Sequence, residues 1–151
     1  MTIRATSVVP VPATQEQVPP SAVSASTDAV LTPYHAMKTR CRLQPEHTVL
    51  CLGIGGLGYN AVAIAKRALG VRCVVACDTR EQALENAKEA GADYIATPAD
   101  LLRALSTNRL VVDFACGGTI HLVGIDGRSL EVSPLAAMLK DFTIKASFYG
   151  T

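Results

Sequence analysis

Three glycines and one aspartate near the middle of this 151-residue chain have the types and spacing of a nucleotide-binding turn. Gly53, Gly55 and Gly58 form a G-x-G-x-x-G motif, and Asp78 follows about twenty residues after the last of them. The first glycine permits a tight turn, the second lets backbone N–H groups approach a pyrophosphate, and the third allows close helix–strand packing. An acid at this distance accepts hydrogen bonds from the adenosine ribose and repels a 2′-phosphate. The pattern therefore predicts binding of NAD in preference to NADP.

A strand, a turn and a helix must surround the glycines for this chemistry to work. Val49–Leu52 is a run of apolar residues, typical of a strand buried on both faces. After the turn, apolar residues recur every three or four positions until Gly70, which predicts a helix that ends at this glycine. A second apolar strand, Cys73–Cys77, leads into Asp78. Strand, glycine turn, helix, strand and acid complete the dinucleotide-binding fingerprint.

The rest of the chain continues the alternation of helices and strands. A helix over about 80–90 would turn Ala83, Leu84 and Ala87 inward and stop at Gly91. We expect further helices at 98–105 and 133–139, and further strands at 93–96, 110–114, 120–123 and 142–148. Alternating elements of this kind predict an α/β fold, a doubly wound parallel sheet of six strands.

One connection departs from that pattern. Only five residues separate Phe114 from Ile120, whereas a parallel crossover needs about a dozen or more. Either the two strands form a hairpin at Gly117–Gly118, or a crossover helix is missing. A missing helix would expose apolar sheet near residues 110–125, with marginal stability and self-association into a homo-oligomer as the expected results.

The N-terminal residues 1–27 contain four prolines, which predict an extended lead-in. Thr27 or Asp28 can then cap a helix that runs to about Arg40. The chain therefore divides into a lead-in, residues 1–27, and a dinucleotide-binding Rossmann domain, residues 28–151.

Composition excludes several classes of partner. The net charge of +1 offers no footprint for nucleic acid or for an anionic membrane surface. No apolar run approaches the roughly 20 residues that span a bilayer. The five cysteines form no C-x-x-C pair, which favours reduced thiols in a cytoplasmic protein over a disulfide framework or a zinc set.

Several motifs together resemble zinc-dependent medium-chain alcohol dehydrogenases. These are T-D-A-V-L-T-P-Y-H-A at 27–36, G-I-G-G-L-G at 53–58, Asp78, and G-T-I-H-L-V-G-I at 118–125. The resemblance covers roughly residues 8–151 and corresponds to the cofactor domain of that family. It implies an oxidoreductase that transfers a hydride between an alcohol or carbonyl substrate and NAD.

The resemblance also implies roles for individual residues. Thr32 and Leu57 would contact the nicotinamide, and Phe148 would contact its carboxamide through the backbone. The implied NAD contacts are Thr32, Gly53, Gly55, Gly56, Leu57, Gly58, Asp78, Val123, Gly124, Ile125 and Phe148. No catalytic side chain is assigned.

Asp28 matches the third ligand of the family's catalytic zinc. The other two ligands, a Cys and a His, belong to a catalytic domain that is missing here, so we expect a truncated chain. A catalytic zinc takes three protein ligands, so Asp28 is expected to cap a helix instead. We therefore expect this chain alone neither to bind zinc nor to oxidise alcohols.

Two alternatives to a dehydrogenase remain open. The first is a non-catalytic NAD-binding fragment or pseudoenzyme. The second is another user of the Rossmann fold, such as a methyltransferase that binds S-adenosylmethionine, although that class usually has a looser glycine loop and lacks the 27–36 motif. Enhanced NADH fluorescence would separate the dehydrogenase and the non-catalytic NAD-binding fragment from the methyltransferase. Alcohol turnover would then separate the dehydrogenase from the non-catalytic fragment.

Overall fold

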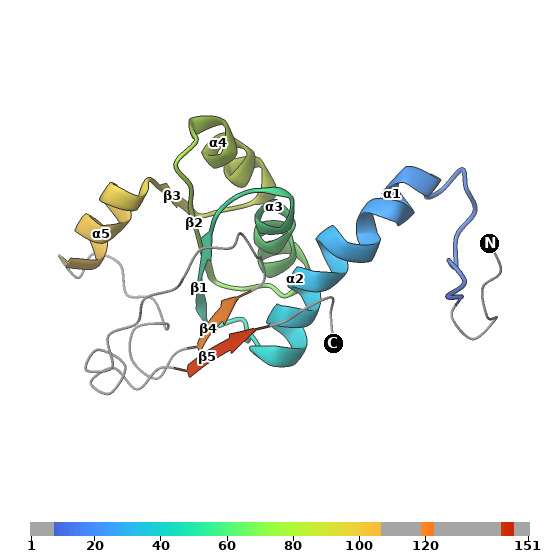
Figure 1. The fold of residues 1–151 in the computed structure, drawn as a ribbon, viewed down its shortest axis with the longest axis horizontal. Coiled ribbons are helices and arrows are strands. Elements are labelled where there is room, and N and C mark those ends of the chain that lie inside the picture. The colour runs from blue at the N-terminus through green and yellow to red at the C-terminus, as the bar shows by residue number, and fades with distance from the viewer. Residues whose placement is uncertain (1–7, 107–118, 123–142, 147–151) are drawn as a thin grey trace.

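The computed structural model describes residues 8–106, 119–122 and 143–146 (Figure 1). Its central feature is a parallel sheet of three strands in the order β1 (Thr48–Leu52), β2 (Cys73–Cys77) and β3 (Tyr94–Ala96). Leu50 of β1 pairs with Val75 of β2, which pairs in turn with Tyr94 of β3. The predicted α/β class and the first three strands are confirmed.

Helices cover both faces of this sheet, as a doubly wound fold requires. Helix α3 (Gly56–Ala63) continues as a π-helical turn (Ile64–Ala68) and packs against α4 (Glu81–Ala90). Val74 and Ala76 of β2 belong to the core cluster beneath these two helices. The alternate residues Val75 and Cys77 pack with Leu101 of α5 (Pro98–Ser106). The strand is buried on both faces because its side chains alternate between these two layers.

Two glycines end the helices where the sequence predicts. Gly70 and Gly91 have φ of +65° and +112°, the left-handed region that favours glycine just after a helix. Ala83, Leu84 and Ala87 are buried on the inner face of α4.

A second parallel pair consists of β4 (Thr119–Leu122) and β5 (Thr143–Ala146), with Ile120 opposite Ile144. The described strands thus form sheets of three and two, and a single sheet of six strands is not confirmed. The expected strand at 110–114 and the helix at 133–139 lie outside the described residues, as do residues 115–118 of the short connection between Phe114 and Ile120.

The N-terminal helix begins earlier than predicted. Residues 20–40 are continuously helical, as α1 (Pro20–Ala25), a π-helical turn (Ser26–Val30), α2 (Leu31–His35) and a second π-helical turn (Ala36–Arg40). The extended lead-in is therefore wrong for residues 20–27. Pro20 occupies the first helical position, where its missing N–H costs nothing. The division at residue 28 stays a prediction.

This N-terminal helix lies along α3 and projects beyond the sheet at its α1 end (Figure 1). Its buried residues are Thr32, Pro33, Ala36 and Met37, and Met37 joins the core cluster that contains Cys51 and Val74. Within the described part of the chain, no helix is long and apolar enough to cross a membrane.

Candidate functional site

The glycine turn joins β1 to α3 at the carboxyl edge of the sheet. Gly53 has a φ of +82°, and its N–H donates to the carbonyl of Cys77 at 2.8 Å, which ties the turn to β2. A Cβ on Gly58 would clash with the backbone carbonyl of Gly53. Backbone geometry therefore demands glycine at both positions, and the predicted tight turn and close packing are confirmed.

The first turn of α3 is open to an anion. Gly55 is the N-cap residue, and it provides no side-chain cap to the N–H groups that follow. A Cβ built on Gly55 or Gly56 would meet no atom within 4 Å. The first N–H groups of a helix lack intrahelical acceptors and lie at the positive end of its dipole. The space beside these glycines is consistent with a bound pyrophosphate.

Asp78 lies at the end of β2 and belongs to the same corner as the glycine turn. Only 8% of the residue is exposed, and its Oδ2 accepts a hydrogen bond of 2.6 Å from the Ile54 N–H. Ile54 directly follows the first glycine of the motif. The acid that the sequence assigns to a ribose is thus joined directly to the turn that it assigns to a pyrophosphate.

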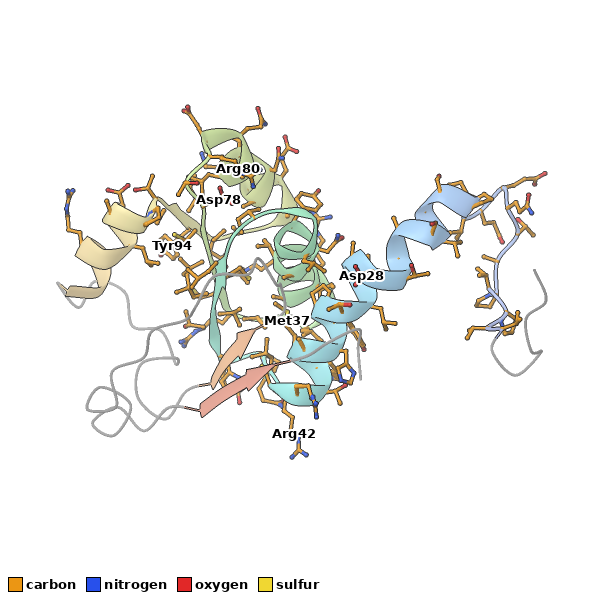
Figure 2. All side chains as sticks on the ribbon, viewed as in Figure 1. Asp28, Met37, Arg42, Asp78, Arg80 and Tyr94 are labelled. Atoms are coloured by element: carbon orange, nitrogen blue, oxygen red, sulfur yellow. The ribbon has the colours of Figure 1, made fainter. Side chains whose placement is uncertain are left out.

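Arg80 also binds this acid, and sequence reasoning missed it. Its Nε donates to Asp78 Oδ1 at 3.1 Å, and its Nη2 donates to Asp78 Oδ2 at 3.2 Å. The same Nη2 also donates to the Ile54 carbonyl at 3.1 Å. Figure 2 labels the two side chains at this corner. The guanidinium holds the pKa of the Asp78 carboxyl well below its usual range, so the carboxylate is ionised at neutral pH. The available signal was a basic residue two positions after the fingerprint acid.

The structure places Asp28 and Thr32 on the N-terminal helix. Thr32 is buried, and its hydroxyl donates to Oδ1 of the exposed Asp28 at 2.8 Å. Asp28 is inside the helix, eight residues after its start at Pro20, so the predicted N-cap is wrong. The part of the chain that the structure describes contains no group of three His, Cys, Asp or Glu side chains that could hold a metal ion.

The remaining predicted contacts fall into two sets. Leu57 is half-buried in the first turn of α3. Four residues lie outside the described part: Val123, which directly follows β4, Gly124, Ile125 and Phe148. Their nicotinamide contacts stay predictions.

The four cysteines within the described ranges form no disulfide with one another. Cys51 and Cys77 are buried in neighbouring strands, and burial raises the pKa of the Cys51 thiol to about 12. A thiol with so high a pKa is a packing group and not a nucleophile at neutral pH.

No protein-family model matches the chain. An NAD-dependent alcohol dehydrogenase of Sulfurisphaera tokodaii is 44% identical over 78 residues, which are 50% of this chain and 22% of that protein. A protein of the same description from Saccharolobus solfataricus is 46% identical over 66 residues, 43% of this chain and 18% of that protein. The homologues of this chain are NAD-dependent alcohol dehydrogenases. The chain aligns with about a fifth of the length of these two alcohol dehydrogenases.

Solved dehydrogenases and reductases share the fold. An alcohol dehydrogenase of Aeropyrum pernix has a TM-score of 0.74 and 26% identity, covering 95% of this chain and 47% of its own. Acetophenone reductase of Geotrichum candidum, solved with NAD, has a TM-score of 0.66 and 29% identity, covering 85% of this chain and 41% of its own. A quinone oxidoreductase of Thermus thermophilus, solved in a complex with NADPH, has a TM-score of 0.69 and 26% identity, covering 88% of this chain and 48% of its own.

Proposed function

We propose that this chain is the NAD(H)-binding part of an alcohol dehydrogenase, an enzyme that moves a hydride between an alcohol or carbonyl compound and a nicotinamide. The observation that carries the proposal is the 2.6 Å hydrogen bond from Ile54 N–H to Asp78 Oδ2. It links the glycine turn and the acid, the two halves of a dinucleotide site. The alcohol dehydrogenase homologues supply the reaction class.

Each half of the site has a defined task in this proposal. The first N–H groups of α3, at Gly56 and Leu57, would bind the pyrophosphate, and Gly55 would leave room for its approach. Asp78 would accept hydrogen bonds from the adenosine ribose. NAD supplies the nicotinamide ring that accepts or donates the hydride. The resemblance to zinc-dependent medium-chain alcohol dehydrogenases would place Thr32, Leu57, Val123, Gly124, Ile125 and Phe148 around that ring.

The preference between NAD and NADP must come from this chain's own residues, because the solved neighbours include complexes with both NAD and NADPH. Asp78 is ionised and lies beside the glycine turn. A carboxylate there disfavours a 2′-phosphate, so we expect NAD(H) to bind more tightly than NADP(H).

The described residues do not fit a catalytic zinc. Asp28 is exposed, bonds to Thr32, and belongs to no three-ligand group in the part of the chain described here. We therefore assign no step to zinc in this chain. A non-catalytic NAD-binding fragment stays the alternative, and assays of alcohol turnover separate it from a self-sufficient dehydrogenase.

Titration of the full chain with NADH, followed by nicotinamide fluorescence, tests the proposal. We expect enhanced emission that saturates, and we expect Gly55→Ala to weaken binding by about tenfold or more, because its methyl group would occupy the space for the pyrophosphate. The variant should melt at the wild-type temperature, since no atom lies within 4 Å of that methyl position. Unchanged emission on adding NADH, or equal affinity in Gly55→Ala, would contradict the proposal.

A further inference from the structure

The carboxylate of Asp78 is already saturated with hydrogen bonds. A carboxylate offers about four acceptor positions. Oδ1 accepts the backbone N–H of Arg80 at 2.9 Å and its Nε at 3.1 Å. Oδ2 accepts the Ile54 N–H at 2.6 Å and Nη2 of Arg80 at 3.2 Å. No acceptor position is left for a ribose hydroxyl in this arrangement.

Two of these four hydrogen bonds come from the Arg80 side chain, one on each carboxylate oxygen. If the guanidinium leaves, each oxygen recovers one acceptor position. A ribose presents two neighbouring hydroxyl donors, which is the number of positions released. The two backbone donors, from Ile54 and Arg80, would continue to hold the carboxylate in place.

The guanidinium itself can receive an anion. The Arg80 side chain is 64% exposed, and its three side-chain hydrogen bonds use Nε and Nη2. An arginine has five N–H donors in a planar fork that suits phosphate. Nη1 has no partner among the described residues, so two donors remain for a ligand. An arginine near the fingerprint acid is the usual means of accommodating a 2′-phosphate.

We propose that Arg80 determines the cofactor preference of this site: its guanidinium covers the acceptor positions of Asp78 and offers its own N–H groups to a 2′-phosphate. The inference rests on the proposed dinucleotide function and deepens it. The chain then accepts NADP(H) as well as NAD(H), with a preference for NAD(H) much smaller than an uncovered Asp78 would give. Removing Arg80 acts twice in the same direction, because it uncovers the carboxylate for a ribose and deprives a 2′-phosphate of its cation.

Calorimetric titration of the wild type, Arg80→Ala and Arg72→Ala with NAD and with NADP tests the proposal. Arg72→Ala is a matched control, because this exposed arginine precedes β2 at the opposite edge of the sheet. We expect the ratio of the NADP Kd to the NAD Kd to rise by about tenfold or more in Arg80→Ala, the effect of one charge-assisted contact. The ratio should stay at the wild-type value in Arg72→Ala.

Each other outcome has a distinct meaning. A ratio that stays constant or falls in Arg80→Ala, with both cofactors still bound, would overturn the proposal and leave the dinucleotide function intact. Loss of both cofactors from Arg80→Ala would make the arginine a structural support for Asp78 and would also overturn it. If the wild type binds neither cofactor, the proposed function fails, and this inference fails with it.

A second measurement on the wild-type chain is independent of any variant. 5′-AMP and adenosine 2′,5′-bisphosphate differ only by the 2′-phosphate. We expect the bisphosphate to bind only slightly more weakly than 5′-AMP, because Arg80 lies beside Asp78 to receive the added charge. Binding that is about tenfold weaker or worse for the bisphosphate would show an uncovered carboxylate and would overturn the proposal.

Discussion

Two regions of this chain carry predicted site residues, and the structure treats them differently. At the corner between β1, α3 and β2 the predictions hold: Gly53 forms the tight turn and Gly58 allows close packing. Asp78 lies at the end of β2 and is hydrogen-bonded to the turn. On the N-terminal helix, Asp28 was expected at the N-cap but lies well inside the helix. A positive φ favours glycine and a backbone clash excludes every other residue, so these positions can be recognised from sequence. An aspartate is tolerated both at a helix cap and on an exposed helix face, so its position cannot be recognised in the same way.

The two regions also differ in how they end their helices. Gly53, Gly70 and Gly91 occupy the positive-φ positions around the sheet. The N-terminal helix instead ends before Arg42, the non-glycine residue with a positive φ, 52°, in the described part of the chain. Local backbone demands are thus met by the ideal residue type near the glycine turn, and by a strained one at the end of the N-terminal helix.

Gly58→Ala should have the largest effect on stability. Its methyl group would clash with the backbone carbonyl of Gly53, which cannot move without distorting the turn. We expect the free energy of unfolding to fall by about 3 kcal/mol, as in overpacked cores. Urea denaturation measures it, with Gly55→Ala as the matched control that stays within about 0.5 kcal/mol of wild type. Equal stability of the two variants would remove the structural reason for the third glycine.

Much of the corner could be predicted because its signals are local. Four consecutive apolar residues, a glycine spacing and helical periodicity specify β1, the turn and α3 without reference to the rest of the chain. The start of the N-terminal helix is less predictable, because the prolines of residues 1–27 disfavour a helix interior, yet proline also favours the first helical position, which Pro20 occupies.

Arg80 was missed for another reason. Sequence spacing shows that a basic residue follows Asp78, but not whether its side chain turns back onto the carboxylate or out to solvent. The hydrogen bond to the Ile54 carbonyl, 26 residues away in sequence, holds it in place, and that contact exists only once β1 and β2 are paired. Contacts between the ends of neighbouring parallel strands are tertiary, so local propensity does not encode them.

The next largest expected difference is between the stability costs of removing Asp78, at the glycine turn, and Asp28, on the N-terminal helix. Asp78→Ala removes the acceptor of the buried Ile54 N–H, which should cost about 1–3 kcal/mol of unfolding free energy at pH 7. Asp28→Ala removes one partly buried hydrogen bond, from the Thr32 hydroxyl to an exposed carboxylate, and should cost about 1 kcal/mol or less. Urea denaturation of both variants at neutral pH makes the comparison. A larger cost for Asp28→Ala would show that the N-terminal helix depends on that pair.

The stability difference between wild type and Asp78→Ala should also depend on pH. The pKa of Asp78 is lowered in the folded chain, chiefly by its hydrogen bonds from Arg80. Its stabilising contribution is therefore complete above the ordinary aspartate pKa of about 4 and is lost as the pH falls below it, because the unfolded chain takes up the proton first. The stability difference between wild type and Asp78→Ala should shrink between pH 5 and pH 3, an interval set by that ordinary value of roughly 4. A constant difference would contradict the lowered pKa.

Arg42→Gly should have the smallest effect, and of opposite sign. Arg42 has a φ of +52° and lies just beyond the end of the N-terminal helix. The residues on either side of it donate to helix carbonyls: Cys41 N–H to Ala36 and Leu43 N–H to Met37. The left-handed conformation costs a residue with a Cβ about 1–2 kcal/mol, and glycine returns part of this through its greater freedom when unfolded. We expect a net gain of about 0.5–1 kcal/mol in unfolding free energy. Lys38→Gly, which places glycine inside the same helix, should instead lose about 0.7 kcal/mol. If both substitutions destabilise the chain, Arg42 makes contacts that outweigh its strained backbone, and the N-terminal helix is as closely specified as the glycine turn.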